Sequence, residues 1–120
     1  MATNITSTTL ESSIATAIVN DLGAACELIF WTAGDVELAT LTGGTATANV
    51  GTSPDSVDIT GLVDDTADTG VVGYATLATT GNAKEVIRFT DPVNDIGLSS
   101  DSFTNGDTVA LTNLAVIVPV

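Results

Sequence analysis

The chain has 120 residues, of which fifteen are acidic and two are basic, so its formal net charge is −13 at pH 7. This excess of acid disfavours binding to DNA, RNA or an anionic membrane, because such contacts depend on Lys and Arg. No segment approaches the roughly 20 apolar residues of a membrane-spanning helix, and residues 1–4 lack the basic stretch of a secretory signal. We therefore expect one soluble domain, made in the cytoplasm or already trimmed to a mature form.

The N-terminal region is predicted to contain one amphipathic helix, over residues 9–22. Thr8 and Glu11 have the spacing of a capping box, in which Glu11 would reach back to the Thr8 N–H, and Gly23 supplies a stop. The apolar stripe packs either on the chain's own domain or on a partner subunit. Its residues at helical spacing are Leu10, Ile14, Ala17, Ile18 and Leu22, and the candidate interface residues are Leu10, Ile14, Ile18 and Leu22.

The rest of the chain is predicted to be β structure, which divides it into an N-terminal arm and helix, residues 1–23, and a β domain, residues 24–120. β-branched residues and turn residues alternate along it. Seven or eight short strands with regular turn signals indicate an all-β fold, an antiparallel β-sandwich of jelly-roll or immunoglobulin-like type. The expected strands are residues 26–32, 36–42, 45–50, 56–63, 71–79, 85–90, 96–99 and 108–118.

Four places carry a specific expectation about the backbone. Residues 43–44, Gly-Gly, are predicted to turn the chain between two strands, and residues 64–70 to form an acidic loop. Gly73 falls inside a predicted strand, which indicates a bulge or a close backbone contact. The alternation of the last strand slips near residues 112–113, which indicates a β-bulge.

Catalytic machinery is not recognisable in the sequence. The chain has no histidine, which removes the usual general base, most nucleophilic triads and most zinc sites. We expect no enzymatic activity and no cofactor. Cys26 lies in an apolar stretch with almost no basic residues in the chain, so it is expected to be a buried, inert thiol; a reactive thiol is the alternative.

Two groups of acidic and amide residues are weak candidates for Ca²⁺, which takes six to eight oxygen ligands. In a chain with this many acids, chance groups in solvated loops are the competing interpretation. The first group is Asp64, Asp65 and Asp68, and the second is Asp101, Asn105 and Asp107.

The aromatic and basic residues are few enough to consider one by one. Lys84 is expected on the surface, and Arg88 is expected to pair with a carboxylate or to lie on an aromatic ring. The aromatic residues fall within strand patterns, so core packing is predicted for Phe30, Trp31, Tyr74, Phe89 and Phe103.

Short motifs follow one another in a characteristic order. They are ELIFWTAG at 27–34, LATLT at 38–42, TAN at 47–49, GVVGY at 70–74, GDTV at 106–109 and VIVP at 116–119. In this order the chain resembles a group of small structural proteins of tailed bacteriophages and prophages. It departs from their pattern at residues 91–95, where a simple hairpin would be expected.

The resemblance implies a virion structural protein with a β-sandwich fold, most specifically a capsid decoration (cement) protein on the capsid surface. Such proteins often form trimers, so it also implies a homo-oligomer that binds the major capsid protein or other virion proteins. The alternatives are a tail, neck or fibre-associated component and a stand-alone adhesive or ligand-binding β-sandwich. Because two bases supply few ion pairs, we expect self-association through residues 2–22, including a flexible arm at 3–9, and through sheet edges.

Overall fold

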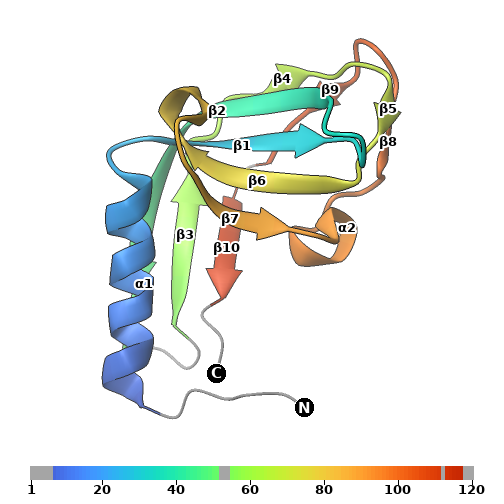
Figure 1. Ribbon diagram of the computed structural model, residues 1–120. Coiled ribbons are helices and arrows are strands. Elements are labelled where there is room, and N and C mark those ends of the chain that lie inside the picture. The colour runs from blue at the N-terminus through green and yellow to red at the C-terminus, as the bar shows by residue number, and fades with distance from the viewer. Residues whose placement is uncertain (1–6, 52–54, 112, 118–120) are drawn as a thin grey trace.

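The computed structural model describes residues 7–51, 55–111 and 113–117 (Figure 1). The chain is mostly β with one longer helix at its start, as the sequence predicts. The elements in chain order are α1 (Thr8–Leu22), β1 (Cys26–Trp31), β2 (Glu37–Asn49), β3 (Ser56–Thr60), β4 (Asp65–Thr66), β5 (Gly70–Val71), β6 (Tyr74–Thr79), the 3-10 helix η1 (Thr80–Asn82), β7 (Glu85–Phe89), α2 (Pro92–Asp95), β8 (Ser102–Phe103), β9 (Thr108–Val109) and β10 (Asn113–Ile117).

Six strands form one curled antiparallel sheet in the order β10-β3-β2-β1-β6-β7. Two small ladders, β4 with β9 and β5 with β8, complete the β structure of the described residues. In Figure 1, β1, β6 and β7 run across the view, whereas β3 and β10 run nearly perpendicular to them. The two-sheet β-sandwich that the sequence suggested is not confirmed, because the main strands belong to a single sheet that bends.

The bend lies within β2, which is one continuous strand of 13 residues. Its first half pairs with β1, and its residues 45–49 pair with β3. The predicted chain reversal at residues 43–44 is therefore wrong. Between the pairs Cys26–Gly44 and Leu28–Leu41 the β2 side contains one extra residue, and Gly43 has φ 73°. This is a β-bulge with a left-handed glycine, which turns the strand without ending it.

Gly44 sits at the crowded inner side of this bend. A Cβ at position 44 would lie 2.8 Å from Leu62 Cδ2, 3.0 Å from Ile59 Cγ2 and 3.1 Å from Cys26 Sγ. The Cys26 thiol donates to the Gly44 carbonyl oxygen at 3.4 Å. Burial, and secondarily the charge of Glu27, raises the pKa of this thiol above its ordinary value. Cys26 is thus a buried, protonated packing residue, as predicted.

The start of α1 differs from the predicted capping box. The N-cap residue is Ser7, whose Oγ accepts the Leu10 N–H at 3.2 Å. Glu11 does not reach back along the helix; it is buried, and its carboxylate accepts the N–H of Asp55, just before β3. Ser12 Oγ adds a hydrogen bond to Asp55 Oδ2 at 2.8 Å. At the other end Gly23 donates to the Val19 carbonyl, so the predicted stop is confirmed.

The buried face of α1 centres on Ala15 rather than on the predicted stripe. Ala15 and Leu22 are buried in the same core as the sheet residues, and α1 contacts β2, β3, β6 and β7. Ala17, which the stripe included, is exposed. Of the candidate interface residues, Leu22, Ile14 and Ile18 pack on this core, whereas Leu10 is 51% exposed.

The N-terminal arm predicted over residues 3–9 is only partly within the described chain. Thr8 and Thr9 already belong to α1, and Ser7 is its N-cap. Residues 1–6, which hold the rest of that prediction, lie outside the described residues.

The remaining departures from the predicted strands have local causes. The acidic loop at 64–70 contains β4 and the start of β5, with Ala67 buried between them. The strand predicted at 96–99 is wrong, because Pro92 begins a short helix and Gly97, at φ 70°, follows it. The last predicted strand is divided into β9 and β10, which pair with different partners; Thr112 lies outside the described residues.

Replacing Gly44 with alanine should destabilise the fold by about 1–3 kcal/mol, the usual cost of overpacking a core. The matched control is Gly34→Ala, because neither glycine has a positive φ and the nearest atom to a Cβ at position 34 is Thr32 Oγ1, at 3.8 Å. Urea unfolding should place the control within about 0.5 kcal/mol of the parent. Equal stabilities for the two variants would contradict the crowded bend.

Candidate functional site

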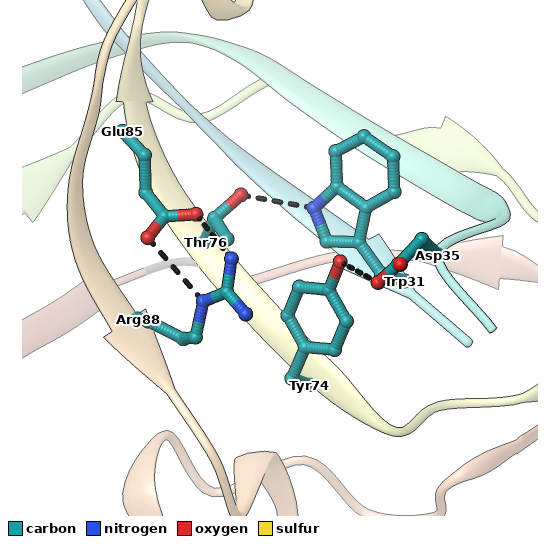
Figure 2. A network of polar contacts seen from close by, with 6 residues as sticks. All are labelled: Trp31, Asp35, Tyr74, Thr76, Glu85 and Arg88. Carbon is teal, nitrogen blue, oxygen red and sulfur yellow. Dashed lines mark hydrogen bonds and ion pairs between the residues drawn. The ribbon is translucent and has the colours of Figure 1, made fainter. Parts of the chain in front are cut away.

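The chain's single Trp, single Tyr and single Arg meet on one surface of the sheet. Along β1, Cys26, Leu28 and Phe30 point into the core, so Trp31 lies on the opposite face. Tyr74 is the β6 residue opposite Trp31, and Arg88 comes from β7. Figure 2 shows the group, which we call the outer-face cluster: Trp31, Asp35, Tyr74, Thr76, Glu85 and Arg88.

The two rings and the guanidinium form a stack across three neighbouring strands. The Trp31 and Tyr74 rings are nearly parallel, at 12°, with centroids 6.1 Å apart. The Arg88 Cζ lies 4.4 Å from the Tyr74 ring centroid, within cation–π range. Because β6 lies between β1 and β7 in the sheet, Tyr74 is the middle member of the stack.

Each polar end of the cluster has a partner inside the cluster. The indole Nε1 of Trp31 donates to Thr76 Oγ1 at 2.9 Å, and the Tyr74 hydroxyl donates to Asp35 Oδ1 at 2.7 Å. The Arg88 Nη2 and Nε donate to the two carboxylate oxygens of Glu85 at 2.8 and 3.3 Å. These contacts fix the side chains before any partner arrives, which lowers the entropic cost of binding.

The same contacts set the titration behaviour of two members. The hydrogen bond to Asp35 is the largest cause that raises the pKa of Tyr74 above its ordinary value, and the hydrogen bond to Glu85 raises the pKa of Arg88. Arg88 therefore stays charged, and Tyr74 stays a neutral donor, throughout the physiological range.

The backbone around the cluster explains why these residues meet. Asp35 has φ 68° in the tight turn between β1 and β2, where the Asp35 N–H bonds to the Thr32 carbonyl at 3.0 Å. A Cβ on Gly73 would lie 2.5 Å from the Ala33 backbone nitrogen, so only glycine allows the chain to approach this turn. The Gly73 N–H also bonds to the Trp31 carbonyl at 2.8 Å. The close contact predicted at Gly73 is confirmed, and it places Tyr74 beside Asp35.

The prediction that all the aromatic residues pack in the core is wrong for Trp31 and Tyr74. Phe30, Phe89 and Phe103 are buried, and the Phe30 and Phe103 rings meet edge to face at 5.7 Å. The outward position of Trp31 could have been predicted from the alternation of side chains along β1, because Trp31 shares a face with Glu27 and not with Phe30. Both alternatives predicted for Arg88 are confirmed, since it pairs with a carboxylate and lies over a ring.

Two of the candidate calcium ligands, Asp65 and Asp107, use a carboxylate oxygen to accept a backbone N–H. Asp65 Oδ2 accepts the Thr40 N–H at 2.9 Å, and the Asp68 N–H bonds to the Leu38 carbonyl. In the second group, Asp107 Oδ2 accepts the Thr104 N–H within its own turn. Nowhere in the described chain do three or more His, Cys, Asp or Glu residues gather so that they could hold a metal ion.

Lys84 lies on the surface, as predicted, and forms an ion pair with Asp21 near the end of α1. Both side chains are about half exposed, so the pair contributes little to stability. Lys84 is therefore not part of the outer-face cluster, and the basic residue of that cluster is Arg88.

Comparisons of this chain with family models, with curated proteins and with solved structures give no match. The resemblance to phage structural proteins therefore stays an expectation that rests on short motifs. Among the helices that the structure describes, none has the length and apolarity needed to cross a membrane.

The single tyrosine makes the cluster accessible to a titration. Ultraviolet titration of the folded chain should give a Tyr74 midpoint above the ordinary value of about 10. Because the folded state holds this proton more tightly than the unfolded state does, stability should fall as the pH rises through that midpoint. Asp35→Asn should move the midpoint down, whereas Asp64→Asn, at an exposed acid outside the cluster, should not. An unchanged midpoint in Asp35→Asn would contradict the hydrogen bond.

Proposed function

We propose that this chain is a non-catalytic structural protein of a virus particle of the tailed-bacteriophage kind. More specifically, we propose a capsid decoration protein that sits on the capsid surface, self-associates there as a trimer and binds the major capsid protein. The motif order described above supports this role. The finer fold assignment, a β-sandwich, belongs to the same proposal.

The observation that carries the proposal is the outer-face cluster as a docking surface. Trp, Tyr and Arg are the residue types most enriched where protein partners bind and where single substitutions cost the most affinity. This chain has one of each, and all three lie together on the face of the sheet away from the core. The main core cluster contains Phe30, Phe89 and Phe103 but neither Trp31 nor Tyr74.

The stack also favours a protein partner over a sugar. A sugar-binding platform presents open ring faces, but here the two rings face each other and Arg88 covers Tyr74. The surface combines two partly buried rings with an exposed guanidinium and the exposed carboxylates of Asp35 and Glu85. Such a surface suits a flat protein interface with a polar rim, so the adhesive or ligand-binding alternative has less support.

The charge of the chain favours a position on a crowded particle surface. A net charge of −13 repels other copies and other particles, which supports solubility at high local density. It also limits the attractive contacts that identical chains can make through charge. Docking on a different protein therefore has to supply part of the binding energy of the proposed trimer.

The experiment has two arms on purified particles that carry the chain. Quantitative mass spectrometry should find a copy number that matches the positions of the capsid lattice. A handful of copies per particle would point instead to the tail, neck or fibre alternative, and complete absence from particles would reject a virion role.

In the second arm, recombinant chain is rebound to particles that lack it. Arg88→Ala should weaken binding by about 30-fold or more, the effect of a hot-spot residue of about 2 kcal/mol. The control is Val36→Ala, because Val36 is 61% exposed and lies outside the cluster. Equal binding by both variants, with folding verified by circular dichroism, would reject the cluster as the docking surface.

A further inference from the structure

The strand β10 forms one edge of the six-stranded sheet and pairs on one side with β3. No other strand among the described residues pairs with its second side, so that side presents a row of backbone N–H and C=O groups. Figure 1 shows β10 beside β3 and nearly perpendicular to β1 and β6.

Natural sheets protect such an edge with charged side chains, proline, bulges or very short strands. The opposite edge, β7, follows this rule, because it carries Glu85 and Arg88. Over its five residues β10 has no charge and no proline, and its register with β3 is unbroken. Ala115 is exposed and Ile117 is 55% exposed, so these two outward positions are apolar as well.

We infer that β10 pairs antiparallel with β10 of a second copy of this chain, around a two-fold axis at Ala115. Pairing of this kind joins two sheets edge to edge through main-chain hydrogen bonds. The two-fold axis places Leu114 of one copy opposite Val116 of the other on the core side, so apolar residues meet apolar residues.

The uncharged composition of β10 fits a second copy better than a basic partner. A basic partner would find no carboxylate on β10, whereas another β10 matches its length and its lack of charge. The nearest acid in the ladder is Asp58, opposite Ala115 on β3. In the joined sheet the two Asp58 residues would be three strand spacings apart, about 14 Å. That is more than the Debye length of about 8 Å at physiological salt, so their repulsion is largely screened.

This contact goes beyond the proposed function and does not depend on it. It joins copies in pairs, so free chain in solution is a dimer, and on a particle the same contact would link neighbouring trimers. Because each chain carries a net charge of −13, the dimer should tighten as salt rises from low to moderate concentration.

Sedimentation equilibrium of the full chain tests the pairing. The parent should show a reversible monomer–dimer equilibrium whose dissociation constant falls as salt is raised. Ala115→Lys should raise the dissociation constant at least tenfold, because a charge is placed at the two-fold axis. The control Val36→Lys, at an exposed apolar residue outside β10, should dimerise like the parent. A parent that stays monomeric or forms trimers in solution would overturn the inference.

Oxidative cross-linking tests the register and does not rely on loss of binding. Ala115→Cys should form a disulfide-linked dimer, because residues directly opposite in an antiparallel pair have Cβ atoms about 5 Å apart. Ile117→Cys should not form this dimer, because residue 117 of the second copy would lie four residues further along the paired strand. Native Cys26 is buried and serves as the unreactive background. Cross-linking of Ile117→Cys alone, or of neither variant, would overturn pairing at Ala115.

Discussion

The bend of β2 at Gly43 and Gly44 determines how the two halves of the sheet pack together. One continuous strand hydrogen-bonds to β1 in its first half and to β3 in its second half, and the bulge at Gly43 changes its direction between them. Because Gly44 has no side chain, Cys26, Ile59 and Leu62 can pack closely around it at the bend. A sheet that turns in this way encloses its own core without a second large sheet.

The two surfaces with proposed roles follow from the same geometry. α1 occupies the core side of the curl, tied to the start of β3 by the buried Glu11 and by Ser12. The opposite face of β1, β6 and β7 is therefore free for Trp31, Tyr74 and Arg88. Beyond the bend the sheet continues with β3 and then β10, which is therefore an edge strand.

The sequence allowed the local elements to be predicted better than their assembly. Gly23 and Gly73 had correct local interpretations, because positive φ and close contact are properties of short segments. Gly-Gly at 43–44 suits a turn and a bulge equally, and only the long-range pairing with Cys26 decides between them. Glu11 had a plausible capping partner nearby but bonds to Asp55, 44 residues away. Strand order, and with it the outer-face cluster and the β10 edge, depends on such distant contacts.

The bent β2 strand unites both halves of the sheet and α1 in one core. The most direct test is thermal unfolding followed by two probes at once. Trp31 fluorescence reports on the β1–β6 half, and helical circular dichroism reports mainly on α1, which packs across the bend. A single shared core predicts coincident transitions with one midpoint. Loss of the helical signal while the Trp31 signal stays native would show that the two halves unfold separately, and would contradict the account.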